Sequence, residues 1–130
     1  MGKTYRLLII DDNEELLVAL ATFFRLKEYR VTTAQNGLDG LKVFENEAEK
    51  FDLLITDLVM PHVSGVGLIS IIKGRYPDFP VIAITGFGKV PEDLAAEAKA
   101  DRIIRKPFDL VEIERIVKDL LDPDVRETAE

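Results

Sequence analysis

Three acidic residues, Asp11, Asp12 and Asp57, each stand at the end of a short apolar run or directly after one. Three carboxylates gathered in one place repel one another and raise each other's proton affinity unless a cation offsets their charge. A cluster that offers only oxygen ligands suits Mg²⁺, which keeps several waters and often bridges a carboxylate to a phosphate. If the fold brings these residues together, the sequence predicts a Mg²⁺ site in which Asp57 is the reactive carboxylate.

Two further polar residues, Thr85 and Lys106, also follow apolar runs. A metal ion, a lysine and a hydroxyl around one nucleophilic carboxylate suit phosphoryl transfer, which depends on in-line positioning and on neutralising the phosphate charge. Taken singly, each residue has a simpler explanation: an acid at a helix start, a loop hydroxyl, or a solvated lysine. Their common place at the ends of strands favours the functional interpretation, with an aspartyl phosphate on Asp57 as product.

The elements that must position these residues alternate along the chain between buried strands and amphipathic helices. The predicted strands cover about residues 5–10, 30–34, 51–56, 81–84 and 103–104, and a helix follows each of them. This alternation predicts one doubly wound α/β domain with five helices and a parallel sheet in the order 2-1-3-4-5. In that order strands 1 and 3 end side by side, so the three acids converge, and Thr85 and Lys106 flank them.

Apolar residues at helical spacing mark the predicted helices. The fourth helix, alanine-rich and running from Pro91 to about Lys99, has a thin apolar face. Asp109, with Glu112 three residues later, is typical of the start of the last helix, whose predicted core face is Ile113, Ile116, Val117 and Leu120. The apolar positions that mark the first three helices are Leu17, Leu20, Ala21 and Phe24, which share one face; Leu41, Phe44 and Ala48; and Leu68, Ile71 and Ile72.

Composition narrows the classes of protein to which the chain can belong. Its 130 residues suffice for one domain, and 47% hydrophobic with 32% charged residues is ordinary for a soluble globular protein. Seventeen basic against 24 acidic residues give a net charge of −7, which disfavours binding to nucleic acid or membrane surfaces. There is no cysteine, and the longest apolar stretch, Leu16 to Phe24, is too short to span a bilayer. We therefore expect a soluble, cytoplasmic protein.

From about Tyr5 to Leu121 the sequence resembles the receiver domains of two-component response regulators. The resemblance rests on the acid pair at 11–12, on DLLITDLVMPHVSG at 52–65, on PVIAITG at 80–86 and on RKPF at 105–108. It implies the flavodoxin-like fold of that family, with a receiver domain over residues 1–122. Residues 123–130 are expected to be a polar tail or the start of a linker.

The resemblance also implies a role for each residue of the acidic cluster. Matched position by position, Asp57 is the phosphoacceptor. Asp12 and Asp57 are expected to bind Mg²⁺ directly together with the backbone carbonyl of Val59, and Asp11 is expected to assist through water. Val59 and Phe87, two apolar residues near the route of an attacking water, are hypothesised to slow the loss of the phosphate.

The same matching implies how a bound phosphoryl group is sensed. Thr85 is expected to hydrogen-bond the phosphoryl group and Lys106 to pair with it, and the Lys106-Pro107 peptide bond is expected to be cis. Ile103 stands where receivers usually carry a Tyr or Phe that swings inward when the threonine moves. An aliphatic side chain has no ring to swing, so the surface of helix 4 and strand 5 is expected to signal differently.

The function that these observations favour is a phosphorylation-dependent signalling switch. The expected phosphodonor is a histidine kinase or a histidine phosphotransfer protein, and the chain would catalyse its own phosphorylation and slow dephosphorylation. The expected output partner is a downstream protein target or a fused effector domain. A homodimer through helix 4, strand 5 and helix 5 is a further partner that the resemblance implies.

Two other functions remain open on the sequence. One is a Mg²⁺-dependent phosphohydrolase with an aspartyl-phosphate intermediate, although such enzymes usually place the nucleophile after strand 1 and a second acid two residues on, where this chain has Asn13. The other is a protein-binding module that works without phosphate. His62, the single histidine, is interpreted as a surface residue, and Asn36-Gly37 as a turn and nothing more.

Overall fold

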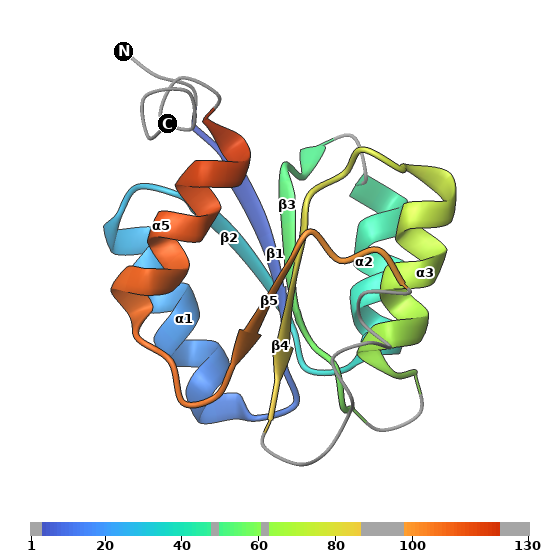
Figure 1. Ribbon diagram of the computed structural model, residues 1–130, viewed down its shortest axis with the longest axis horizontal. Helices are drawn as coiled ribbons and strands as arrows, with labels where there is room; N and C mark the ends of the chain where they lie inside the picture. The colour runs from blue at the N-terminus through green and yellow to red at the C-terminus, as the bar shows by residue number, and fades with distance from the viewer. Residues whose placement is uncertain (1–3, 48–49, 61–62, 87–97, 123–130) are drawn as a thin grey trace.

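Five parallel strands form the centre of the molecule in the computed structural model, which describes residues 4–47, 50–60, 63–86 and 98–122. The strands lie side by side in the order β2-β1-β3-β4-β5, and every neighbouring pair is parallel (Figure 1). The doubly wound α/β fold and the strand order predicted from the sequence are therefore confirmed. The strands are β1 (Arg6–Ile10), β2 (Arg30–Ala34), β3 (Leu53–Asp57), β4 (Val81–Thr85) and β5 (Arg102–Arg105).

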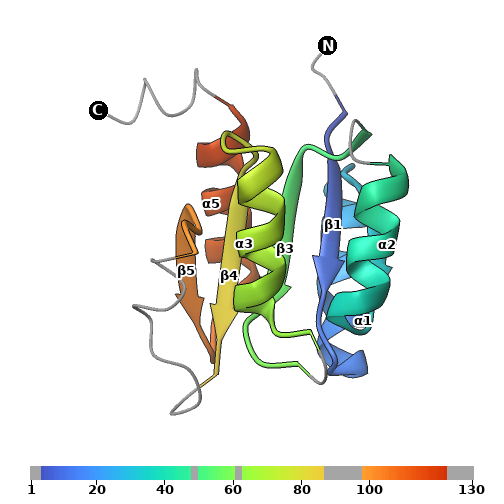
Figure 2. The same ribbon diagram turned by 90° about the vertical axis from the view of Figure 1, so that its right-hand side faces the viewer.

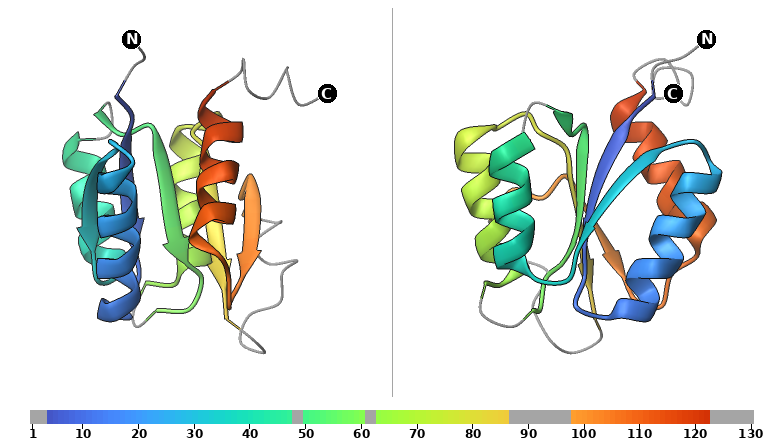
Figure 3. Two further views of the ribbon diagram at one scale, coloured as in Figure 1. Left: turned by 90° about the vertical axis from the view of Figure 1, so that its left-hand side faces the viewer. Right: turned by 180° about the vertical axis from the view of Figure 1, so that it is seen from behind.

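The helices cover both faces of the sheet. Helices α1 (Glu14–Leu26) and α5 (Leu110–Leu121) lie on one face, while α2 (Gly37–Glu47) and α3 (Gly65–Arg75) lie on the other (Figures 1 and 2). Figure 3 shows the molecule from the side on which α1 and α5 lie and, in its second view, from behind, with the two helix layers on either side of the sheet. The fourth predicted helix falls mainly on residues 87–97, which lie outside the described part of the chain, as do Phe87, His62 and the segment 123–130. Within the described ranges, every helix is too short to cross a bilayer.

Side chains of the central strands alternate between two separate hydrophobic cores, one on each face of the sheet. Leu8 and Leu54, which are register partners, pack on the α2 and α3 side, whereas Ile9 and Ile55 pack on the α1 and α5 side. All residues of β3 and β4 are buried, because a parallel sheet flanked by helices has no face left for water. The polar residues at the ends of these strands are consequently held on a rigid support.

The starts of the helices differ in detail from the sequence-based expectation. Asn13 is the N-cap of α1, and its side-chain oxygen accepts a hydrogen bond from the Leu16 N–H at 3.1 Å. The two acids before it are thus not the caps of this helix. Asp109 is the N-cap of α5, as the pattern predicts, but its side chain makes no cap hydrogen bond. The pairing of Asp109 with Glu112 therefore locates the helix start without supplying a side-chain cap.

Most of the apolar positions that mark the predicted helices are buried. The four positions of α1 are all buried, and so are Phe44 and, in α5, Ile113 and Val117. Ile71, one of the positions that mark α3, is 38% exposed, whereas Ile69 is completely buried. The buried positions of α3 include residues 65, 68, 69 and 72, the ordinary stripe of a helix that packs on a sheet. Ala48 lies outside the described residues.

Candidate functional site

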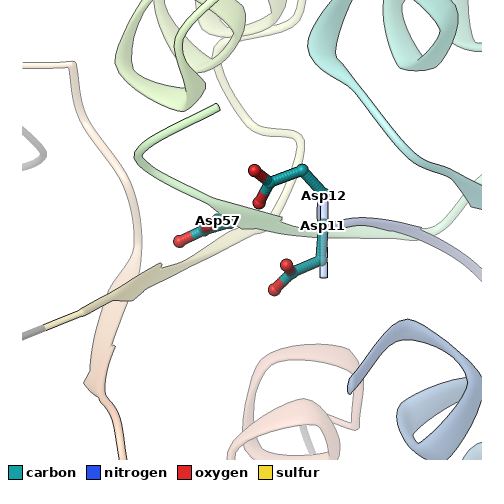
Figure 4. A group of neighbouring side chains, drawn as sticks. All are labelled: Asp11, Asp12 and Asp57. Carbon is teal, nitrogen blue, oxygen red and sulfur yellow. The ribbon is translucent and has the colours of Figure 1, made fainter. Parts of the chain in front are cut away.

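The three predicted carboxylates meet at the carboxyl ends of β1 and β3. Asp57 is the last residue of β3, Asp11 and Asp12 follow β1 directly, and Ile10 of β1 lies opposite Thr56 of β3 in the sheet register. One oxygen atom from each carboxylate lies within 4.8 Å of the other two. Figure 4 shows the three side chains extending to the same side of these strand ends. The convergence follows from the topology, because the chain leaves neighbouring strands β1 and β3 toward opposite faces of the sheet.

Backbone hydrogen bonds fix the two buried members of the cluster. The Asp11 N–H donates to the Ala34 carbonyl at 3.2 Å, and its carboxylate Oδ1 accepts from the Asn13 N–H at 2.8 Å. Beyond Asp57, the Leu58 N–H donates to the Ile84 carbonyl at 2.9 Å. Asp11 is fully buried and Asp57 is 5% exposed, whereas Asp12 is exposed. The cluster therefore has two buried carboxylates held by the backbone, Asp11 and Asp57, and one carboxylate exposed to water, Asp12.

Lys106 places one positive charge beside the two buried carboxylates. Its Nζ lies 3.6 Å from Asp11 Oδ2 and 3.9 Å from Asp57 Oδ1. The Lys106 N–H donates to the Thr85 carbonyl at 2.9 Å, which places the lysine directly beyond β5, and the Lys106-Pro107 peptide bond is cis. Among the described residues, this ammonium group is the cation recorded within 4 Å of the carboxylates, and it lies beside two of the three, so the described part of the site carries an excess of negative charge.

Thr85 ends β4, next to the strand that carries Asp57. It is 3% exposed, and its hydroxyl donates to the Gly86 carbonyl at 3.3 Å. Ile103, the predicted departure from the aromatic pattern, pairs with Ala83 in the sheet and packs partly buried against the core on the α2 and α3 side. Val59 lies in the loop that leaves Asp57. The roles assigned to these three residues by sequence matching remain predictions.

Burial and the neighbouring carboxylates both raise the pKa of Asp57. Burial, followed by the neighbouring charge of Asp11, raises the pKa of Asp57 from 3.8 to about 6, and Asp12 adds to the rise. Lys106 and the hydrogen bond from the Leu58 N–H act in the opposite direction. The single lysine thus offsets only part of the repulsion, and a second cation would relieve the rest.

One oxygen atom of the cluster points to the same conclusion. Asp11 Oδ2 is buried and, within the described part of the chain, accepts no hydrogen bond. A buried carboxylate oxygen left without a hydrogen-bond partner is costly, and the Lys106 ammonium at 3.6 Å is beyond hydrogen-bonding distance. An oxygen-only donor set with surplus negative charge and such an oxygen suits a hard divalent cation.

Sequence reasoning missed the groups that hold the carboxylates in place. The backbone N–H of Asn13 donates to Asp11, and the same residue caps α1 with its side chain. An Asn directly before a helical pattern is an ordinary N-cap signal, so this role was available from the sequence. The link from Leu58 to β4 was not, because it depends on which strands are neighbours.

A comparison with protein families identifies the family of the chain. Residues 7–118 match the sequence profile of the response regulator receiver domain. The chain belongs to this family. The match covers the ends of all four strands that carry the candidate site residues, and the expectation drawn from the motifs is confirmed.

Individual relatives support the same assignment. The receiver domain is 33% identical over 129 residues to the transcriptional regulatory protein GlrR of Escherichia coli K12, covering 98% of this chain and 29% of that protein. It is also 33% identical over 120 residues to the probable transcriptional regulator ycf27 of Cyanidium caldarium, covering 92% of this chain and 47% of that protein. The chain thus spans less than half the length of either relative.

Solved structures agree with the fold. A receiver domain from Clostridium thermocellum superposes with a TM-score of 0.86 at 27% identity, covering 92% of this chain and 96% of that one. The response regulator TrrA of Thermotoga maritima, solved in complex with Mg²⁺ and BeF, superposes with a TM-score of 0.82 at 31% identity. That match covers 91% of this receiver and all of the other chain.

Proposed function

We propose that this receiver domain accepts a phosphoryl group on Asp57 in a Mg²⁺-dependent reaction and acts as a signalling switch. The observation that carries the proposal is the cluster of three carboxylates within 4.8 Å of one another, with one lysine ammonium beside two of them. Family membership supports phosphorylation-based signalling as the general function. The metal, the acceptor and the phosphodonor are the finer parts of the proposal.

The donor set fits Mg²⁺. Asp12 and Asp57 would hold the ion directly with the carbonyl of Val59, and Asp11 would assist through water. The related TrrA structure, which contains Mg²⁺ and BeF, supports this choice of metal. When bound, the ion supplies positive charge that neutralises the carboxylates and the incoming phosphoryl oxygens.

The residues of the chain then divide the work of the transfer. A carboxylate oxygen of Asp57 attacks the phosphorus in line with the leaving group, a new oxygen–phosphorus bond forms, and the bond from phosphorus to the donor breaks. Lys106 pairs with the charge of the transferred group, and the Thr85 hydroxyl donates a hydrogen bond to it. The leaving group departs with the electron pair of the broken bond.

The proposed phosphodonor is a histidine kinase or a histidine phosphotransfer protein. Receiver domains of two-component systems interact with histidine kinases and effector domains, and the curated relatives are longer proteins named as transcriptional regulators. A downstream protein target or an attached effector domain is the proposed recipient of the signal. We also propose a homodimer through β5, α5 and the predicted fourth helix, which lies outside the described residues.

The proposed readout passes through Thr85 and Ile103. Movement of the threonine toward the phosphoryl group would vacate space near β5, and the aliphatic Ile103 would fill it by changing its packing. Val59 and Phe87 would exclude water from the phosphoryl group. A Val59→Asn variant is expected to lose the phosphoryl group faster than the unaltered protein, as measured by following the intact mass over time.

Intact-mass spectrometry after incubation with acetyl phosphate tests the central step. The expected result is addition of one phosphoryl group, which requires Mg²⁺, does not form when a chelator is present from the start and is absent in Asp57→Asn. Trapping with hydroxylamine locates the labile group and separates the switch from the phosphohydrolase, since the phosphohydrolase would carry it at Asp11. An unchanged mass under conditions that modify a control receiver contradicts the proposal.

A further inference from the structure

The turn from β2 into α2 is held by several hydrogen bonds of Asn36. The side-chain Oδ1 of Asn36 accepts a hydrogen bond from the Asp39 N–H at 2.8 Å, and the Asn36 carbonyl accepts from the Gly40 N–H at 3.0 Å. The Asn36 side-chain amide also donates to the Asp39 carboxylate at 3.0 Å. These bonds cap the helix and fix the orientation of its first turn. The turn is therefore more than the simple reversal predicted from Asn36-Gly37.

Gly37 brings this turn against the loop that follows the acceptor. A Cβ atom at Gly37 would press on the carbonyl oxygen of Val63 and would lie 2.9 Å from the Val63 Cβ, closer than real Cβ atoms approach. Val63 belongs to the loop between Asp57 and α3. Because the obstacle is backbone, it cannot yield as the tip of a flexible side chain does. Only a residue without a side chain lets α2 and this loop meet so closely.

Gly40 makes the corresponding contact with β1. It lies three residues after Gly37, so both glycines face the same side of the helix. A Cβ at Gly40 would overlap Cδ1 of Ile10 and would lie 2.9 Å from its Cγ1. Ile10 is fully buried and directly precedes Asp11. The terminal methyl of Ile10 thus occupies the space that an alanine side chain would need.

We propose that the first turn of α2 is a positioning element of the acidic site, acting through Gly37 and Gly40. Gly37 sets how closely the loop after Asp57 approaches α2, and Gly40 sets the same for the end of β1 that carries Asp11 and the neighbouring acid. One rigid turn thereby fixes the separation of the two chain segments that supply the carboxylates. The inference deepens the proposed function, since that separation matters for metal binding and phosphoryl transfer.

Alanine substitutions test the proposal in the full chain. Gly37→Ala is expected to weaken Mg²⁺ binding and to slow modification by acetyl phosphate about tenfold or more, since a displacement of about 1 Å can cost roughly 100-fold. Gly74→Ala is the matched control, because Gly74 is also a helical glycine but a Cβ there meets nothing within 4 Å. It should leave both quantities within about twofold of the unaltered protein. Mg²⁺ affinity is measured by titration followed through amide NMR shifts.

Gly40 provides an internal rescue experiment. Gly40→Ala alone is expected to perturb the amide shifts of Asp12 and to weaken Mg²⁺ binding, because the added methyl displaces Ile10. Ile10→Val with Gly40→Ala removes the Cδ1 atom that the new methyl strikes, so it should restore a large part of the lost Mg²⁺ affinity, because the exchange roughly conserves volume; the Cγ1 atom, 2.9 Å away, stays. If Gly40→Ala weakened Mg²⁺ binding only by destabilising the whole fold, adding Ile10→Val would not restore the binding. Failure of the double variant to improve on Gly40→Ala overturns the role given to Gly40.

Two further measurements separate positioning from simple destabilisation. Ile113→Val, in the core on the α1 and α5 side, should lower the melting temperature without changing Mg²⁺ affinity. If Gly37→Ala does not fold, Asn36→Ala, which loosens the same turn without adding bulk, must weaken Mg²⁺ binding relative to Gly74→Ala. A folded Gly37→Ala, or an Asn36→Ala, that binds Mg²⁺ as well as the control overturns the proposal.

The test also distinguishes this inference from the proposed function. If the unaltered protein takes no phosphoryl group, the proposed function fails. The positioning role is then still decided in the metal-free protein by the amide shifts of Asp12 and Leu58. The amide shifts of Asp12 and Leu58 should change in Gly37→Ala and stay the same in Gly74→Ala. If they change in neither variant, the inference is overturned.

Discussion

Two lysines in this receiver domain, the buried Lys73 and the partly buried Lys106, face carboxylates in different surroundings. The Nζ of Lys73 lies 2.8 Å from Asp101 Oδ2 and donates to the Pro77 carbonyl at 3.2 Å, while the same Asp101 oxygen accepts from the Val81 N–H at 2.7 Å. The charges are balanced and hydrogen-bonded. This arrangement ties the end of α3 to the segment before β5 and leaves little for a ligand to gain.

At Lys106 the charge balance is incomplete. Its ammonium lies 3.6 Å and 3.9 Å from two carboxylates of a group of three, an oxygen of Asp11 has no hydrogen bond in the described structure, and Asp57 has a raised pKa. Lysine and aspartate thus form a hydrogen-bonded ion pair at Lys73. At Lys106 they form a cluster in which part of the negative charge has no partner in the described structure. Unsatisfied charge distinguishes the candidate site from the structural tie, and a buried group with a perturbed pKa is typical of functional sites.

Replacing Lys106 should give the largest effect. Lys106→Met is expected to slow modification by acetyl phosphate about 100-fold, because a preorganised positive charge at the transferred group is lost. The rate is followed by intact-mass spectrometry at saturating Mg²⁺. Unfolding by urea should show that the variant is folded. A rate within a few-fold of the unaltered protein would mean that Lys106 does not neutralise the transferred group.

Replacing Lys73 should produce the opposite pattern. Lys73→Met is expected to lower the free energy of unfolding by about 2 to 4 kcal/mol, somewhat less than for a fully buried pair because the Asp101 side chain is 35% exposed. The rate of modification should change little in the folded variant. Urea unfolding followed by circular dichroism measures the loss, and unchanged stability would show that the ion pair contributes nothing net.

Acidity should affect stability through the unbalanced cluster. The pKa of Asp57 is about 6 in the folded protein and 3.8 ordinarily, so the native state binds the extra proton between these values. The stabilisation that this bound proton gives the native state is complete below about pH 4 and is lost as the pH rises through about 6. The free energy of unfolding should fall by roughly 1 to 3 kcal/mol over this range.

The difference in unfolding free energy between Asp57→Asn and the unaltered protein isolates this contribution. In metal-free solution the difference should grow in favour of Asp57→Asn from about pH 4 to about pH 7. Saturating Mg²⁺ should reduce it, because the ion offsets the repulsion that raises the pKa. A difference that stays constant with pH would contradict the interpretation of the cluster as overcharged.

A third acid–base pair, at the surface, should give the smallest effect. Arg102 and Asp119 lie 2.6 Å apart but are 39% and 28% exposed in their side chains. Asp119→Asn is expected to cost at most about 1 kcal/mol of unfolding free energy, because water and salt screen exposed pairs. The free energy of unfolding of Asp119→Asn, measured at low and high salt, checks this. A larger loss that persists in high salt would show that the pair stabilises the fold as the ion pair of Lys73 and Asp101 does.

The sequence predicted the sheet well because strand signals and topology rules are strong and local. Each apolar run ended where a polar residue was expected, and the strand order then brought Asp11 and Asp57 together without further information. Alternation of strands and helices with right-handed crossovers leaves few topologies to choose among. The residues of the candidate site could therefore be named from local patterns and strand order alone.

Details that depend on contacts between distant segments were not predictable. In α3 the run of isoleucines marks a helix without showing which of them is buried, and packing on the sheet buries Ile69 while Ile71 stays 38% exposed. The tie between Lys73 and Asp101 and the contact between Gly37 and Val63 join residues whose proximity only the folded chain reveals. Spacing rules describe one helix at a time and cannot supply such pairs.

The carboxylates and the lysine of the site come from positions 11 to 106, so nearly the whole domain must exist before they can meet. A chain emerging from the ribosome carries Asp57 long before β5 and its lysine arrive. During that interval the aspartate has neither its neutralising partner nor its finished strand support. Under the proposed function, synthesis of the protein and readiness to receive a signal are thereby separated in time, because a product that ends before Lys106 lacks the lysine of the site.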